Sequence, residues 1–252
     1  MDSPTLSLRA FKFKDTVQKA FGLLGLEVRR KRSEWHDLEF LRLARIKTVL
    51  DIGANSGQFA TEARQMLPDA IIHCFEPVRR EYSKLIKLGA KDPRLFAYNI
   101  ALGEEEKGIL MEVNDFTPSS SMLHMTSAHV RAFPYTARAC QEKVRVVPLD
   151  SWASKASLEP PLLIKLDVQG YEDRVIRGGI KTVKRAAVIL TEVSFCELYE
   201  GQALFTDLYS TLCGLGFRCA GMIRNLCDAS SRILSCDAIF VGSEMDFYRD
   251  GQ

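Results

Sequence analysis

From Lys47 onward, short apolar runs alternate with stretches of helical periodicity, and this alternation restricts the fold more than any other feature of the sequence. Short apolar runs separated by helices are typical of parallel strands joined by crossover helices. The sequence therefore predicts a doubly wound α/β domain built on a mostly parallel, seven-stranded sheet. The expected strands are Thr48 to Ile52, Ile71 to Phe75, Leu95 to Ile100, Leu162 to Leu166, Val188 to Thr191, Gly216 to Ile223 and Ala238 to Val241.

Helical periodicity lies between most of these runs. The expected helices are Gln58 to Leu67, Arg79 to Leu88, Tyr171 to Ile176 and Leu204 to Leu215. No long helix separates the last two strands, so we expect one antiparallel addition at the edge of the sheet.

Two segments fall outside this pattern. Residues 1–45 are expected to form an N-terminal helical appendage, with helical periodicity from Leu8 to Arg45 and a basic stretch at residues 29–32. These helices either cover an edge of the domain, with their charges in water, or make peripheral contact with an anionic membrane surface or a lipid-linked substrate. We prefer the first alternative, because mixed-charge faces usually meet solvent. Within the main domain, residues 46–252, the segment 107–152 is an insertion where acceptor specificity is expected.

Composition excludes several classes of protein. The 34 basic and 32 acidic residues give a net charge of only +2, so no overall field favours nucleic acid as a partner. No apolar run is long enough to span a bilayer, and the first residues lack the features of a secretory signal, which predicts a cytoplasmic location. The seven scattered cysteines never form C-x-x-C, as expected of reduced thiols.

A glycine-rich turn follows the first strand, in the sequence VLDIGANSGQF. Gly53 and Gly57 allow tight turns, and Asn55 tolerates turn geometry. Glu76 ends the next strand about 20 residues later, a spacing typical of an acid that binds ribose hydroxyls. Together the turn and the acid predict a nucleoside site.

The turn also discriminates among nucleosides. No Lys follows Gly57, so the turn is not a phosphate-binding P-loop, and it lacks the third glycine of a dinucleotide loop. Asp51, just before the turn, would repel a pyrophosphate but suits the positively charged amino group of a methionine. S-adenosylmethionine is therefore the expected cofactor.

The motifs resemble, in order, those of the FkbM family of S-adenosylmethionine-dependent methyltransferases, over about Thr48 to Gly242. They are VLDIGANSGQFA, FEPV, NIALG, SSSML, LLIKLDVQGYEDRVIRGG, EVSFCELYEGQALF and CDAIFVG. The resemblance implies a Rossmann-like, class I methyltransferase fold and O-methylation of a hydroxyl on a sugar, glycoconjugate or polyketide.

The resemblance also implies roles for individual residues. It assigns contacts with the methionine part of the cofactor to Asp51, Gly53, Asn55 and Gly57. It places Glu76 at the ribose and Ala101 against the adenine.

Two further acids, Asp167 and Glu192, end neighbouring strands. One interpretation makes Asp167 the general base, assisted by Glu192; another makes both ligands of a Mg²⁺ ion; a third makes Asp167 a helix cap. His124 is a further candidate base if its loop folds over the site. Lys165 is expected to point away from the neighbours of Asp167, toward the margin of the sheet interior, and to have no role in the chemistry.

One position departs from the family pattern. The family's usual DVEG is DVQG here, so Gln169 lacks the negative charge of the usual Glu. Glu172 is an alternative source of that charge.

Two other functions fit parts of this pattern. An NAD-dependent oxidoreductase would share the sheet and the ribose acid but needs the missing glycine and a catalytic Tyr with Lys or His. A non-catalytic nucleoside-binding module would keep only the pocket. The sequence leaves the acceptor and the oligomeric state open.

Overall fold

The computed structural model describes residues 36–114, 120–133, 139–243 and 245. The chain divides into two units, Met1–His36 and Asp37–Gln252, and the second holds almost all of the described residues. Most of the expected N-terminal appendage, with the basic stretch at residues 29–32, lies outside them. The described end of this segment forms a 3-10 helix, η1 (His36–Arg42).

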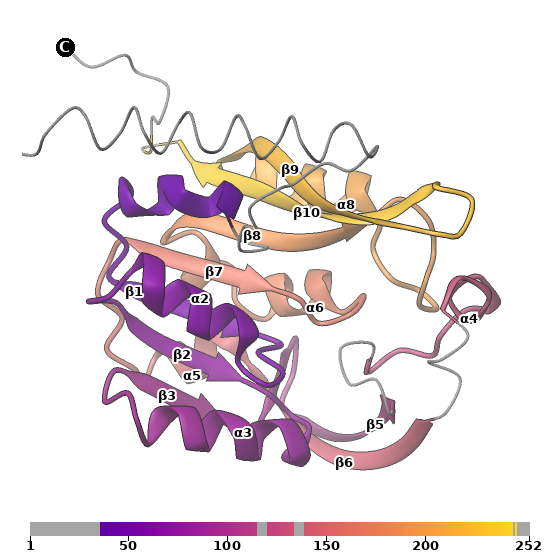
Figure 1. Cartoon of the computed structure of the whole chain (residues 1–252), viewed down its shortest axis with the longest axis horizontal. Helices are drawn as coiled ribbons and strands as arrows, with labels where there is room; N and C mark the ends of the chain where they lie inside the picture. Colours follow the sequence, from indigo (N-terminus) through magenta and orange to yellow (C-terminus); the bar gives the residue numbers. More distant parts are fainter. Residues whose placement is uncertain (1–35, 115–119, 134–138, 244, 246–252) are drawn as a thin grey trace, which may run out of the picture. The chain divides into compact units, whose positions relative to one another are not determined.

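A seven-stranded sheet forms the centre of the second unit (Figure 1), with the strand order β3-β2-β1-β7-β8-β10-β9. The first five of these strands pair in parallel, which confirms the expected doubly wound sheet. The strands are β1 (Thr48–Ile52), β2 (Ile71–Phe75), β3 (Leu95–Tyr98), β7 (Leu162–Leu166), β8 (Ala186–Ser194), β9 (Phe217–Cys227) and β10 (Ile233–Gly242).

The antiparallel strand is β10, and it pairs with both β8 and β9. It therefore lies inside the sheet rather than at its edge, which corrects the expected position. The reason is that β9 and β10 form a hairpin whose second strand pairs with β8, so that β9 becomes the edge.

Helices cover both faces of the sheet (Figure 1). The helices α2 (Gln58–Met66) and α3 (Arg79–Gly89) lie on one face. The main apolar core fills the other face, where side chains of β1, β7 and β8 pack against four helices. These are α5 (Leu149–Ala153), α6 (Glu172–Arg177), α7 (Ile180–Val183) and α8 (Phe205–Gly214). Among the described residues, no helix combines the length and the apolar content needed to cross a membrane.

The segment expected as an insertion contributes to a second, three-stranded sheet with the order β4-β6-β5. Its strands are β4 (Ala101–Gly103), β5 (Lys107–Asn114) and β6 (Ala139–Pro148), and the short helix α4 (Ser127–Ala132) lies between β5 and β6. Gly178, which follows α6, is in close backbone contact with β4 of this sheet. A Cβ atom at this position would lie 1.8 Å from the carbonyl oxygen of Gly103.

Candidate active site

Four acids lie at or just beyond the carboxyl ends of neighbouring parallel strands. Asp51 is in β1 and Glu192 in β8, whereas Glu76 follows β2 and Asp167 follows β7. Since these strands run in the same direction, the four acids share one edge of the sheet. This is the edge at which doubly wound sheets bind their ligands.

The glycine turn after β1 packs directly against the end of β7. Gly53, Asn55 and Gly57 all have positive φ angles, of 81°, 47° and 88°. A Cβ atom on Gly53 would lie 1.9 Å from the carbonyl oxygen of Asp167, so no other residue fits without backbone movement. The turn thus brings the cofactor-binding residues expected from the sequence into contact with the candidate base.

Glu76 holds the glycine turn in place. Its two carboxylate oxygens accept hydrogen bonds from the backbone N–H groups of Asn55 and Val78, both at 2.8 Å. Burial raises the pKa of Glu76 to about 7. Each oxygen keeps a second lone pair, so contact with ribose hydroxyls stays a prediction beside this observed role.

Lys165 connects two of the acids, contrary to the expectation that it points away from them. Its Nζ atom lies 3.0 Å from Oδ2 of Asp167 and 3.7 Å from Oδ1 of Asp51. Residues two apart in a strand share a face, so Lys165 and Asp167 point to the same side. Despite burial, the two carboxylates raise the pKa of Lys165, which stays charged.

Asp51 is the most buried member of this group. Its side chain has no exposed surface, and neither of its oxygens accepts a hydrogen bond from the described residues. Burial raises its pKa to about 6, although Lys165 opposes the shift. A buried carboxylate that lacks hydrogen-bond donors, next to a turn that excludes side chains, fits the amino group of S-adenosylmethionine.

Gln169 joins the two acids proposed for chemistry. Its Nε2 atom lies 2.8 Å from Oδ1 of Asp167 and 2.7 Å from Oε2 of Glu192. Burial would raise the pKa of Asp167, but Lys165 and the Gln169 amide lower it below its usual value. Burial and the negative charge of Asp167 raise the pKa of Glu192 well above its usual value. Asp167 is thus the ionised acid of the pair, and 34% of its side chain is exposed.

Two loops meet at Gln169. The Tyr199 hydroxyl donates to Oε1 of Gln169 at 2.7 Å, and the Ser121 hydroxyl donates to the backbone oxygen of Gln169 at 2.7 Å. Ser121 belongs to the SSSML motif and Tyr199 to the SFCELYEG motif, so both motifs contact Gln169. Glu172 instead accepts from the backbone N–H groups of Val168 and Gly170, at 3.0 and 3.3 Å.

Two predicted site residues lie apart from this group. His124 exposes 69% of its side chain, and its Nδ1 atom lies 2.8 Å from Oε1 of Glu112. Ala101 begins β4 and pairs with Val146, so it belongs to the smaller sheet rather than to the end of β3. A catalytic role for His124 and an adenine contact for Ala101 stay predictions.

Asp167 and Glu192 do not fit the alternative role of Mg²⁺ ligands. The two carboxylates are joined by an N–H donor, whereas Mg²⁺ prefers oxygen ligands around it. In the described part of the chain, no group of three or more His, Cys, Asp or Glu side chains is arranged to hold a metal ion.

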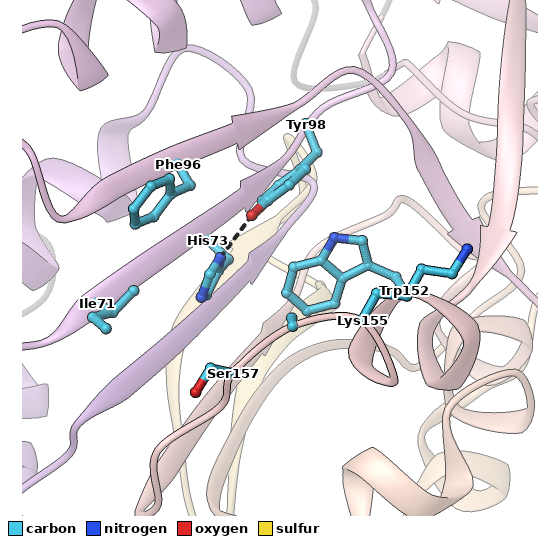
Figure 2. Close-up of a pocket in the computed structure, with 8 residues that line it drawn as sticks. Ile71, His73, Phe96, Tyr98, Trp152, Lys155 and Ser157 are labelled. Atoms are coloured by element: carbon cyan, nitrogen blue, oxygen red, sulfur yellow. Dashed lines mark hydrogen bonds between the residues drawn. The ribbon is translucent and has the colours of Figure 1, made fainter.

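A separate hollow of about 450 Å³ lies beside β2 and β3 (Figure 2). The His73 ring lies among the aromatic side chains that line this hollow, and its Nδ1 atom is 3.1 Å from the Tyr98 hydroxyl. Burial lowers the pKa of His73 to about 4, so the ring is neutral. None of the predicted site residues lines this hollow, whose lining is Ile71, His73, Phe96, Tyr98, Trp152, Lys155, Ala156 and Ser157.

Comparison with known proteins identifies a relative in Sinorhizobium fredii, the 2-O-methyltransferase NoeI. It is 33% identical over 165 residues, which is 61% of this chain. The alignment covers 66% of the relative, slightly less than two thirds of its length.

Two solved structures are also similar. Magnesium protoporphyrin IX methyltransferase from Synechocystis PCC 6803 matches with a TM-score of 0.46 and 10% identity, over 82% of this chain and 77% of that one. Precorrin-6y C5,15-methyltransferase from Geobacter metallireducens matches with a TM-score of 0.44 and 10% identity, over 82% of this chain and 88% of that one.

The methyltransferase FkbM domain matches residues 51–219, which include the glycine turn and all four acids of the sheet edge. This match decides against the NAD-dependent oxidoreductase considered from the sequence. The chain belongs to the FkbM family of S-adenosylmethionine-dependent methyltransferases.

Proposed function

We propose that this protein transfers a methyl group to a hydroxyl of a sugar, glycoconjugate or polyketide-type acceptor, with Asp167 as the general base. The observation that carries this proposal is the position of Asp167, which is paired with Lys165, partly exposed and in backbone contact with the glycine turn. The relative from Sinorhizobium fredii is named a 2-O-methyltransferase, which supports oxygen as the acceptor atom.

The base is needed because a sugar hydroxyl is a weak nucleophile. As its oxygen forms a bond to the methyl carbon, the hydroxyl proton passes to a carboxylate oxygen of Asp167. Lys165 keeps Asp167 ionised before the transfer, and Gln169 fixes the orientation of its carboxylate. Most of the remaining rate acceleration comes from holding the acceptor oxygen in line with the methyl group.

The cofactor binds at the same edge of the sheet, at Asp51 and the glycine turn. When bound, S-adenosylmethionine supplies an electrophilic methyl group and leaves as S-adenosylhomocysteine. Asp51 accepts hydrogen bonds from the amino group of its methionine part. Gly53 and Gly57 allow the backbone to approach the cofactor closely. Glu76 keeps the turn in this shape and contacts the ribose hydroxyls, while Ala101 lies near the adenine. We expect this reaction in the cytoplasm, on a small-molecule or glycan acceptor.

The test is a methyl-transfer assay with labelled S-adenosylmethionine and a panel of mono- and oligosaccharides and hydroxylated polyketides. The variant Asp167→Asn should reduce kcat on a methylated acceptor by about 10²- to 10⁴-fold, because it removes the proton acceptor. Its affinity for S-adenosylhomocysteine, measured by calorimetry, should stay within about threefold of the unsubstituted chain, since a neutral amide keeps the shape of the side chain.

Full activity of Asp167→Asn would show that another group takes the proton. Tight binding of S-adenosylhomocysteine without transfer to any acceptor in the panel would instead favour the non-catalytic nucleoside-binding module.

A further inference from the structure

The amide of Gln169 has a hydrogen-bond partner at each of its polar positions. Nε2 donates to Asp167 and to Glu192, and Oε1 accepts from Tyr199. We call the two contacts of Nε2 the amide bridge. Gln169 makes these contacts from a left-handed backbone, with φ of 54°, which is uncommon for a residue other than glycine. The turn thus directs this side chain back onto Asp167, two residues earlier in the chain.

Only one orientation of the amide suits these partners. If the amide were turned over, Oε1 would face the ionised Asp167 at 2.8 Å, and two acceptors would repel each other there. The observed orientation places a donor against each acid and an acceptor against the Tyr199 hydroxyl. The bridge is therefore determined by the chemistry of its three neighbours.

The bridge lies where a divalent cation would have to bind. A cation shared by Asp167 and Glu192 would lie between Oδ1 and Oε2, and the Nε2 atom of Gln169 occupies that place, 2.8 Å from the first oxygen and 2.7 Å from the second. The other oxygen of Asp167 accepts from Lys165, and the other oxygen of Glu192 accepts from Ser235. Each oxygen of Asp167 thus has one donor from the protein and keeps a second lone pair for the acceptor hydroxyl.

The bridge also links the base to the acceptor side. The same residue that orients Asp167 accepts hydrogen bonds from Tyr199 and Ser121, which lie on two different loops. A shift of either loop changes the position of the amide, and hence of the Asp167 oxygen that the amide holds.

We propose that Gln169 is a positioning residue whose amide replaces a divalent cation between Asp167 and Glu192, so that methyl transfer needs no metal. This proposal rests on the proposed function for its kinetic part only. Its metal-binding part can be tested on the protein without any acceptor.

The informative variant is Gln169→Glu, which keeps the size of the side chain but replaces the bridging N–H donors with a third carboxylate. Oxygen-rich sites of this kind bind divalent cations. We expect the unsubstituted protein not to bind Mn²⁺ in electron paramagnetic resonance titrations up to millimolar concentrations, and the variant to bind one ion. The matched control is Gln202→Glu: Gln202 uses its Oε1 atom to accept from the backbone N–H groups of Leu198 and Tyr199, which a carboxylate also does. This control should not bind Mn²⁺.

Activity gives the second measurement. EDTA should leave methyl transfer by the unsubstituted protein unchanged, and Gln169→Glu should lower kcat by about 100-fold without added metal, the effect of a misplaced reacting group. KM for the acceptor should change much less than kcat. If Gln169→Glu does not fold, Tyr199→Phe, which removes only the hydroxyl on Oε1, should still lower kcat more than KM.

Three results would overturn the proposal: loss of activity of the unsubstituted protein in EDTA, Mn²⁺ binding by the unsubstituted protein, or full activity of Gln169→Glu without metal. Failure of Gln169→Glu to bind Mn²⁺ would also show that the amide does not stand in for a cation. If no acceptor is methylated, the proposed function fails, while the Mn²⁺ titrations still report on Gln169.

Discussion

Gly53→Ala should be among the most damaging single substitutions of a small residue in this protein. The added Cβ atom would lie 1.9 Å from the carbonyl oxygen and 2.8 Å from the carbonyl carbon of Asp167, both backbone atoms. The positive φ of Gly53 costs an alanine about 1–2 kcal/mol, and forced backbone displacement in a packed region costs about 1–3 kcal/mol more. We therefore expect the free energy of unfolding to fall by about 2–5 kcal/mol, the sum of these two costs.

Two other glycines allow the cost of the positive φ to be measured apart from the cost of the backbone displacement. Gly216 has a φ of 96° with nothing within 4 Å of an added Cβ, so Gly216→Ala should cost only the backbone part, about 1–2 kcal/mol. Gly214 ends α8 with an ordinary φ and nothing within 4 Å, so Gly214→Ala should be neutral or stabilise by up to about 1 kcal/mol.

Urea unfolding of the three variants measures these differences. Because the clash displaces the end of β7, methyl transfer by Gly53→Ala should also fall by about 100-fold, the effect of misplacing the base. Equal destabilisation by Gly53→Ala and Gly216→Ala would refute the argument that the turn is in backbone contact with Asp167.

Three further experiments test the charges of the site. Lys165→Met should lower the free energy of unfolding by about 3 kcal/mol, because it leaves Asp51 buried without its cation, and adding Asp51→Asn should recover part of that loss in urea unfolding; strictly additive effects would contradict this pairing. The pKa of Glu76 is raised from 4.5 to about 7, so the folded state binds the extra proton and loses stability as the pH rises through this range. Between pH 5 and pH 8, the free energy of unfolding should therefore fall by about 3 kcal/mol less in Glu76→Gln than in the unsubstituted protein. Parallel pH profiles of the two proteins would rule this out. His124→Ala should lower methyl transfer less than tenfold, because its ring is exposed; a loss as large as that of Asp167→Asn would identify His124 as the base.

The sequence predicted the sheet well because its inner strands are buried on both faces. Runs such as LLIKL, in β7, are almost continuously apolar and begin and end where the strand does. The acids that follow such runs could be predicted at one edge, because parallel strands end on the same side. The inner position of β10 could not, since a hairpin has two possible orders at an edge and the pattern fits both.

The contacts among the site residues were harder to predict. The pairing of Lys165 with Asp167 follows from the two-residue period of a strand, and that signal was present in the sequence. The amide bridge was not predictable in the same way, because it depends on the left-handed φ of Gln169 and on Tyr199, 30 residues away in the chain. The positions of long loops, such as the one that carries His124, depend on contacts that no local pattern encodes.

The attachment of two loops to a single glutamine also bears on how acceptor preference could be altered. Ser121 and Tyr199 reach Gln169 through one hydroxyl each, and the Gln169 amide contacts Asp167, the proposed base. Loops exchanged between relatives would retain the base geometry if they kept these two hydroxyls, whatever the length and composition of the remainder. The site is in this sense modular, and loop grafting that preserves Ser121 and Tyr199 is a direct route to variants with new acceptors.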